Sequence, residues 1–212
     1  MIIQIPNGMF AENTYLIVDA QARECAIVDP GEEAGLILHK VEEIGARPVA
    51  IWLTHAHVDH VLGVPAVAQR TGAPVWLHPA DRPLYDAVPD QAAWFGLVAP
   101  DRLPVPDNDM VHGNSLAVGE LRFEVRHAPG HSPGSVCLVG PGVALTGDVL
   151  FAGSIGRTDL PGGDFETLIG SIERELLTLP DDTILYSGHG PETTVGRERH
   201  SNPFLKGLSR IA

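Results

Sequence analysis

Basic residues are scarce in this chain of 212 residues, which has 14 lysines and arginines against 27 aspartates and glutamates. The formal net charge is −13, and no cluster of lysine or arginine occurs along the sequence. A nucleic acid presents phosphates that need a basic protein surface, and an anionic membrane makes the same demand. The composition therefore argues against nucleic-acid and membrane partners.

Long hydrophobic runs and cysteines are also few. The apolar runs are far too short to span a bilayer, and the N-terminal residues lack the basic start and long apolar stretch of a signal peptide. Cys25 and Cys137 each lie in an apolar, strand-like run, so we expect two buried thiols rather than a disulfide. These observations lead us to expect a cytoplasmic protein.

Hydrophobic residues make up 44% of the chain, and its 23 glycines and 18 prolines are spread along it, which favours a real core with many tight turns. Short apolar runs predict strands, and apolar residues at helical spacing predict helices. The predicted strands cover residues 1–5, 14–19, 24–29, 49–53, 75–77, 116–118, 121–127, 136–139, 143–146 and 183–186. The predicted helices cover about residues 32–44, 60–71 and 164–179.

The order of these elements mixes strands and helices, with hairpin-like strand pairs near both ends of the chain. Two packed sheets with helices outside fit this order better than one doubly wound parallel sheet, so the predicted fold class is α+β. No linker composition divides the chain and no internal repeat is evident, which predicts one domain over residues 1–212.

Residues 79–115 are the hardest part to interpret, because they are rich in proline, lack long periodic segments and contain the bulky pair Trp94-Phe95. They predict a surface insertion with a short helix at about residues 80–87. Such an insertion either shapes access to a neighbouring site or serves as a plain connection.

Metal-binding side chains gather in one short stretch, directly after the apolar run at residues 49–53. The stretch reads Thr54-His55-Ala56-His57-Val58-Asp59-His60. Residues two apart in an extended segment point the same way, so His55 and His57 can converge on one cation, whereas Asp59 and His60 follow the next turn. Imidazoles with a carboxylate suit zinc, iron or manganese. The spacing indicates two ions rather than one.

Three further candidate ligands, His131, Asp148 and His189, each lie beside a glycine and next to a predicted strand. Glycine lets the backbone approach a site closely. Each of these positions alone would be an ordinary turn residue, but together with the first stretch they supply two complete ligand sets.

The ordered pattern of these seven candidate ligands resembles the metallo-β-lactamase superfamily over nearly the whole chain. The resemblance implies a four-layer αββα sandwich with the metals at one edge of the two sheets. It further implies that one metal is held by His55, His57 and His131, that a second is held by Asp59, His60 and His189, and that Asp148 bridges both.

Within the superfamily the chain is most similar to the glyoxalase II, or hydroxyacylglutathione hydrolase, branch. The supporting stretches are Pro129-Gly130-His131-Ser132-Pro133-Gly134, Gly156-Arg157-Thr158-Asp159, and Gly188-His189-Gly190-Pro191-Glu192-Thr193-Thr194 with Asn202-Pro203. Full-length members have a C-terminal helical domain that supplies much of the glutathione contact, whereas only about 20 residues follow Gly190 here. The chain therefore resembles the short, single-domain members of the branch.

This resemblance implies hydrolysis of a small-molecule thioester of the S-lactoylglutathione type by a metal-bridging hydroxide. Two divalent ions, zinc before iron or manganese, would lower the pKa of bound water from about 15.7 toward 7. Asp59 is expected to bind the second metal and to accept a hydrogen bond from the nucleophile.

Several neighbouring groups have two interpretations each. Thr54 and Ser132 either orient ligands or are local turn hydroxyls. Arg157 and Asp159 either hold a substrate anion or form an ion pair that fixes a loop, and we prefer the ion pair. The histidines without ligand neighbours are expected to be surface or satisfied core residues, namely His39, His78, His112, His127 and His200.

Two competing functions follow from the same motifs. Persulfide dioxygenases resemble this family but use one iron held by two histidines and one aspartate, which here would be His55, His131 and Asp148. The segment Gly188-His189-Gly190-Pro191 favours hydrolysis, because the dioxygenase pattern usually lacks it. A metal-binding module without catalysis is disfavoured because all the ligands are present.

Overall fold

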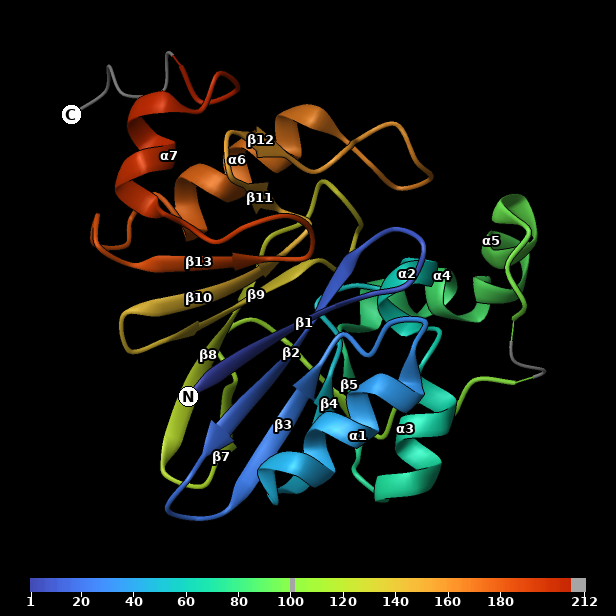
Figure 1. Cartoon of the computed structure of the whole chain (residues 1–212). Helices are drawn as coiled ribbons and strands as arrows, with labels where there is room; N and C mark the ends of the chain where they lie inside the picture. The colour runs from blue at the N-terminus through green and yellow to red at the C-terminus, as the bar shows by residue number, and fades with distance from the viewer. Residues whose placement is uncertain (100–101, 207–212) are drawn as a thin grey trace.

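The computed structural model describes residues 1–99 and 102–206, and it arranges them in four layers (Figure 1). The first six-stranded sheet contains, in spatial order, β1 (Ile2–Asn7), β2 (Glu12–Asp19), β3 (Glu24–Val28), β4 (Arg47–Trp52), β5 (Val75–Leu77) and β6 (Asn108–Asp109). The second contains β14 (Thr193–Thr194), β13 (Ile184–Ser187), β10 (Val143–Gly147), β9 (Val136–Gly140), β8 (Leu121–His127) and β7 (Ser115–Val118). A separate small ribbon pairs β11 (Leu150–Phe151) with β12 (Ser154–Ile155).

The helices cover the outer faces of the two sheets and one of their edges (Figure 1). They are α1 (Ala34–Ile44), α2 (Val58–Val61), α3 (Val64–Thr71), α4 (Arg82–Asp86), α5 (Val88–Phe95), α6 (Phe165–Glu175) and α7 (Val195–Ser201), with a 3₁₀ turn at Pro79–Asp81. Helices α1 and α3 pack on the first sheet, and α6 packs on the second. The predicted α+β sandwich is confirmed.

Three apolar cores fill the spaces between the four layers. Strand β3 shows why its sequence is apolar throughout: Cys25 and Ile27 face the helices, whereas Ala26 and Val28 face the other sheet. Successive side chains of a strand point to opposite faces, so a strand buried on both sides has no polar alternation. Cys25 and Cys137 are both buried and unpaired, as predicted.

Parallel pairing places the functional loops at one edge of the sandwich. β3 pairs parallel to β4, and β10 pairs parallel to β13. Parallel strands have their carboxyl ends at the same edge of a sheet. The segments that follow β3 and β4 therefore emerge at one edge of the first sheet, and those that follow β10 and β13 emerge at one edge of the second.

The element boundaries follow the predictions closely where an apolar pattern is strong. The helix predicted at residues 60–71 is instead two helices, α2 and α3, which are separated near Gly63. Gly63 packs so closely on the backbone carbonyl of Gly31 that a Cβ there would lie 2.3 Å from it. Helix α6 ends at Glu175, before the predicted end at residue 179.

Two helices were not predicted at all. Helix α5 follows the predicted helix at residues 80–87, which is itself a 3₁₀ turn followed by α4. Helix α7 lies in a polar segment, and only Val195 and Glu198 of its residues are buried, so it has no apolar stripe to reveal it. Residues 100–101 and 207–212, which the predicted domain includes, lie outside the described residues.

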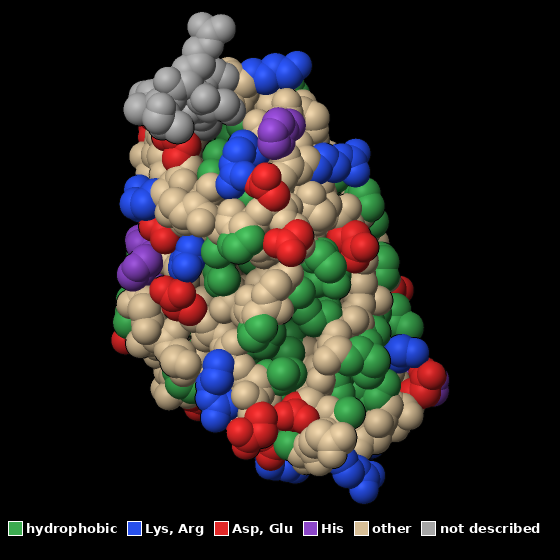
Figure 2. Space-filling model, turned by 90° about the vertical axis from the view of Figure 1, so that its left-hand side faces the viewer, with side chains coloured by type: hydrophobic (Ala, Val, Ile, Leu, Met, Phe, Trp, Pro, Cys, Tyr) green, Lys and Arg blue, Asp and Glu red, His purple; other side chains and the backbone are tan. Residues whose placement is uncertain are grey.

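The surface carries mixed charge. On the face shown in Figure 2, basic and acidic side chains are interspersed among hydrophobic ones, and no broad basic area is visible. Within the described part of the chain, no helix combines the length and apolar character needed to cross a membrane.

Gly130 lies in the loop after β8 and packs against the start of α6. Its φ is +130°, and its carbonyl accepts a hydrogen bond of 2.8 Å from the N–H of Asp164 at the start of the helix. A Cβ at Gly130 would lie 2.3 Å from the backbone nitrogen of Leu168. The position therefore requires glycine for both its backbone conformation and its packing.

We expect Gly130→Ala to lower the free energy of unfolding by about 2–4 kcal/mol, because it adds backbone strain and a steric clash. Urea denaturation followed by circular dichroism measures this change. The matched control is Gly170→Ala within α6, where a Cβ meets no atom within 4 Å. That variant should be neutral or more stable by about 0.5–1 kcal/mol. Equal stabilities of the two variants would contradict the role given to Gly130.

Candidate metal centre

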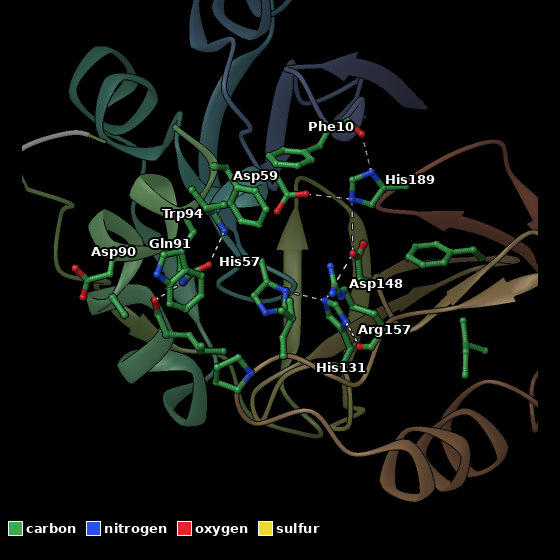
Figure 3. A pocket seen from close by; sticks show the side chains of 18 residues that line it. Phe10, His57, Asp59, Asp90, Gln91, Trp94, His131, Asp148, Arg157 and His189 are labelled. Carbon is green, nitrogen blue, oxygen red and sulfur yellow. Dashed lines mark hydrogen bonds and ion pairs between the residues drawn. The ribbon is translucent and has the colours of Figure 1, made fainter. Parts of the chain in front are cut away.

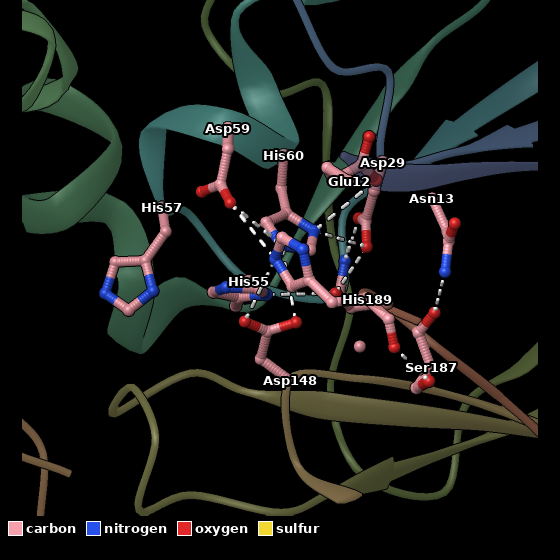
Figure 4. A network of polar contacts seen from close by, with 12 residues as sticks. Glu12, Asn13, Asp29, His55, His57, Asp59, His60, Asp148, Ser187 and His189 are labelled. Carbon is pink, nitrogen blue, oxygen red and sulfur yellow. Dashed lines mark hydrogen bonds and ion pairs between the residues drawn. The ribbon is translucent and has the colours of Figure 1, made fainter. Parts of the chain in front are cut away.

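The structure brings all seven predicted ligand residues together at the edge of the sandwich (His131 in Figure 3, the other six in Figure 4). They are His55, His57, Asp59, His60, His131, Asp148 and His189. Four of them follow β4 and enter α2, and the others follow β8, β10 and β13. One continuous segment after β4 thus supplies four of the candidate ligands, and three loops of the second sheet supply the other three.

The first group consists of three histidines. His57 Nδ1 lies 2.8 Å from His131 Nε2, which in turn lies 3.2 Å from His55 Nε2. The three nitrogen atoms therefore converge on one point, as the ligands of a single cation do.

The second group consists of Asp59, His60 and His189. Asp59 Oδ2 lies 3.2 Å from His189 Nε2 and 3.8 Å from His60 Nε2. This group contains a carboxylate and two imidazoles, which is also a suitable donor set for a divalent metal.

Asp148 lies between the two groups. Its Oδ1 atom is 3.4 Å from His60 Nε2, and its Oδ2 atom is 3.6 Å from the Nε2 atoms of both His131 and His189. The carboxylate therefore contacts members of both groups, which is the position expected of a bridging ligand.

Burial and mutual proximity set the protonation of these groups. Burial, together with neighbouring His131, lowers the pKa of His57 to about 3. Burial and the facing histidines likewise hold the pKa of His55 well below its ordinary value. Both imidazoles are therefore neutral at physiological pH, which is the form that binds metals.

The pKa values of His60 and Asp148 shift in the directions that favour their charged forms. Burial lowers the pKa of His60, but the carboxylates of Asp59 and Asp148 outweigh it and raise the pKa above its ordinary value. Burial raises the pKa of Asp148, but the facing imidazoles, with His60 first, outweigh it and lower the pKa. A positive charge is thus favoured between these groups, and a divalent ion supplies more of it than a proton.

Among the described residues, four buried side-chain atoms have no hydrogen-bond partner, and two of them, His60 Nε2 and Asp148 Oδ1, belong to candidate ligands. Buried polar atoms are normally satisfied, and leaving them unpaired costs free energy. Gly188 adds to this evidence, because a Cβ there would lie 2.2 Å from Asp148 Oδ1. The donors and the space around them fit bound metal ions.

Asp29 orients two of the histidines. Its carboxylate accepts hydrogen bonds from the Thr54 backbone N–H (2.7 Å) and hydroxyl (2.6 Å) and faces His60 Nδ1 at 3.1 Å. The Thr54 hydroxyl also lies 3.1 Å from His55 Nδ1. These contacts occupy the Nδ1 atoms of His55 and His60 and leave their Nε2 atoms directed at the centre.

Asp81 joins two ligand-bearing loops. It accepts hydrogen bonds from the backbone N–H of Ala56 (3.0 Å), the Ser132 hydroxyl (2.8 Å) and the N–H of Gly134 (2.6 Å). Burial raises the pKa of Asp81. Ser132 therefore contacts a carboxylate that supports the ligands, rather than a ligand side chain.

The predicted roles of Arg157 and Asp159 concern a loop beside the site. The two side chains form two hydrogen bonds of 2.8 Å with each other and are both exposed. The backbone carbonyl of Arg157, in contrast, lies 2.8 Å from His131 Nδ1. The main chain of this loop thus orients a ligand, while its side chains pair at the surface.

Sequence reasoning missed Glu12, Asp29 and Asp81. Glu12 is buried, which raises its pKa, and its Oε1 atom lies 3.7 Å from His60 Nδ1. Asp29 begins an Asp-Pro-Gly turn directly after β3, so its carboxylate could have been recognised as a polar group at this edge of the sheet. Glu12 and Asp81 have no comparable local signal, because their contacts depend on distant segments.

Of the five histidines outside the candidate ligands, His39 is exposed, and the other four have contacts elsewhere. The rings of His78 and His127 stack with centroids 4.0 Å apart. His112 Nδ1 accepts a hydrogen bond from the backbone N–H of His127, and His200 Nδ1 lies 2.6 Å from the Gly196 carbonyl.

A cavity of about 610 Å³ opens beside the two groups (Figure 3). His57, Asp59, His131, Asp148 and His189 line its floor. Helices α4 and α5 line another side, so the segment that was hardest to interpret from sequence lies at the site.

The family model of the metallo-beta-lactamase superfamily matches residues 7–189, which include every one of these ligands. This chain belongs to that superfamily. Among curated relatives, hydroxyacylglutathione hydrolase GloC of Haemophilus influenzae is 43% identical over 97% of this chain and 98% of its own length.

Solved structures of the superfamily superpose closely on this one. The BLEG-1 B3 metallo-beta-lactamase has a TM-score of 0.90 at 40% identity, covering 98% of this chain and 100% of that one. TTHA1623 in a di-iron-bound form has a TM-score of 0.88 at 41% identity, covering 96% and 100%. ETHE1 from Myxococcus xanthus has a TM-score of 0.81 at 28% identity, covering 96% and 83%. The chain is thus a metallo-hydrolase-like enzyme with a candidate metal site.

We expect Asp148→Asn to reduce the metal content per chain to one ion or less and to weaken the remaining binding at least about tenfold, because it removes the carboxylate shared by both groups. Elemental analysis after dialysis measures the content, and circular dichroism checks the fold. The control is Asp86→Asn, an exposed carboxylate on α4 outside the cavity, which should bind metal as the unmodified protein does. Unchanged metal content in Asp148→Asn would refute the bridging position.

We expect Asp81→Ala to lower the free energy of unfolding by about 2–4 kcal/mol, because it leaves buried donors of two loops without an acceptor. Urea denaturation of the metal-free protein measures this loss. Asp81→Asn keeps the volume and one carbonyl acceptor, so its loss should be smaller. A loss below about 0.5 kcal/mol in the alanine variant would contradict the role given to Asp81.

Proposed function

We propose that the protein is a metal-dependent hydrolase of small thioesters, of the type represented by S-lactoylglutathione. The observation that carries the proposal is the Asp148 carboxylate between two complete donor groups, which is the arrangement of a two-metal hydrolase. The similarity to hydroxyacylglutathione hydrolase GloC supports the choice of a thioester. Zinc is our first choice of metal, and iron is the second because the chain is similar to a di-iron protein.

When bound, two divalent ions would supply a hydroxide nucleophile at neutral pH and polarise the carbonyl of the substrate. The residues of the chain would hold those ions and orient the reactants. Asp59 lines the cavity and is expected to accept a hydrogen bond from the attacking water. The neighbouring aromatic rings would exclude bulk water from this point.

The leaving group also favours a thioester. The described residues that line the cavity include no lysine, tyrosine or cysteine that could protonate a departing atom. The other acidic or basic groups in the lining are the candidate ligands, the exposed Asp90 and Arg157. A thiolate leaves without such help, whereas an alkoxide or an amine needs a proton. The unpaired, buried cysteines fit a reducing compartment, and we include a cytoplasmic location in the proposal.

A persulfide dioxygenase is the second candidate, and the similarity to ETHE1 favours it. His55, His131 and Asp148 would hold its single iron. The second donor group of Asp59, His60 and His189 supports the hydrolase instead, because a single-iron enzyme has no use for it.

The direct test measures hydrolysis of S-lactoylglutathione by purified protein, with metals quantified in the same sample. We expect rapid loss of the thioester with close to two ions per chain. A persulfide with oxygen-electrode detection and a chromogenic β-lactam are assayed in parallel, the latter because BLEG-1 is similar. Oxygen consumption or β-lactam hydrolysis without thioester hydrolysis would overturn the proposal.

We expect Asp59→Asn to lower kcat for the thioester by about 10²–10⁴-fold, because it removes both a metal ligand and the acceptor for the attacking water. Circular dichroism should show an intact fold. Asp86→Asn serves again as the exposed control and should retain full activity. Full activity in Asp59→Asn would refute the role given to this carboxylate.

A further inference from the structure

The cavity beside the metal-binding groups has an apolar wall that the proposed chemistry does not require. Six large apolar side chains from separate segments build it: Phe10, Leu84, Trp94, Phe95, Phe151 and Leu160. They come from the β1–β2 turn, α4, α5, β11 and the loop before α6. In Figure 3 the labelled Phe10 and Trp94 lie on the side of the cavity that carries Asp59 and Gln91.

This wall starts directly at the candidate ligands. The Phe151 ring lies 6.1 Å from the His189 ring, edge to face, and the Phe10 carbonyl lies 3.2 Å from His189 Nδ1. The Phe10 ring in turn packs edge to face against Phe95, with centroids 5.1 Å apart. An apolar group held against these rings would therefore keep an attached carbonyl near the metal-binding groups.

The outer part of the wall is exposed. Trp94 is 65% exposed and Phe95 is 43% exposed, although both lie on a short helix that buries Ala92 and Val88 instead. Exposing two neighbouring aromatic rings in a hollow is unfavourable without an apolar ligand, and such patches commonly mark binding sites.

The cavity offers a glutathione carrier few cationic partners. Arg157 is the single lysine or arginine among the described lining residues, and Asp159 already occupies its guanidinium through two hydrogen bonds. Asp90 adds a negative charge to the same lining. Glutathione carries two carboxylates, which would find no free cation away from the metal-binding groups.

We propose that this cavity binds the apolar acyl group of a thioester, and that the acyl group rather than the thiol carrier determines specificity. The inference deepens the proposed function and rests on it for the thioester bond. The wall of Trp94, Phe95 and Phe10 holds an aliphatic or aromatic acyl chain, the metal-binding groups receive the carbonyl, and the thiol carrier extends toward solvent.

The first experiment measures binding without hydrolysis. Four thioethers are titrated by calorimetry into the metal-loaded protein: S-hexyl and S-methyl derivatives of glutathione and of neutral N-acetylcysteamine. We expect the hexyl group to improve affinity at least about tenfold on either carrier, because several methylenes are buried. We expect the change of carrier to alter affinity by less than about threefold. A carrier effect larger than the hexyl effect, or no binding of any hexyl compound, would overturn the inference.

The second experiment uses the corresponding hexanoyl and acetyl thioesters. We expect Trp94→Ala to lower kcat/KM for the hexanoyl compounds about tenfold and to leave the acetyl compounds within about threefold. Val98→Ala is the control, because Val98 is 93% exposed in the same segment and does not line the cavity. Arg157→Gln should change kcat/KM for the glutathione and N-acetylcysteamine thioesters by the same factor, and a loss confined to the glutathione compounds would show that Arg157 recognises the carrier.

The two proposals fail in different ways. If no thioester is hydrolysed but the hexyl thioethers bind, the proposed function is wrong and the apolar subsite stands. If thioesters are hydrolysed with a strong preference for glutathione over N-acetylcysteamine, the hydrolase stands and the apolar specificity is wrong.

Discussion

The free-energy cost of burying imidazole and carboxylate groups without partners governs this edge of the molecule. His60 Nε2 and Asp148 Oδ1 are buried and face each other at 3.4 Å without a hydrogen bond, and the opposed pKa shifts of His60 and Asp148 indicate that positive charge is favoured between them. Buried polar groups in native proteins are normally satisfied by a protein group, a water molecule or an ion. Bound cations would satisfy these groups. The surrounding structure must then hold the donor atoms at separate positions around each cation.

The rigidity of the donors comes from contacts one layer further out. Asp29 connects the end of β3 to Thr54 and His60, and Asp81 connects the Ala56 segment to the loop that carries His131. Both carboxylates accept main-chain hydrogen bonds, so they hold the backbone as well as side chains. A ligand that is held by its main chain and by its second nitrogen has little freedom to adopt another rotamer, which favours metal binding through preorganisation.

The sequence predicted the parts of this arrangement that depend on local pattern or on an ordered motif. Residues 49–53 are apolar because β4 is buried on both faces, and the spacing of His55 and His57 follows from the extended chain after it. The contacts of Glu12 and Asp81 could not be predicted in this way, because they depend on how distant loops meet. Helix α7 was missed for a related reason: its short buried face offers no periodic signal.

The segment at residues 79–115 shows how one hydrolytic centre can acquire its own substrate preference. Its α4 and α5 contribute nothing to the two donor groups, yet Leu84, Trp94 and Phe95 form much of the wall that a substrate would meet. Gln91 fixes this segment to the centre, because its amide oxygen accepts from the Val58 N–H (3.0 Å) and its nitrogen donates to the Ala56 carbonyl (3.2 Å). We therefore expect substitutions on the exposed side of α5 to change the shape of the cavity while the ligands stay in place, which would separate the proposed substrate preference from metal binding.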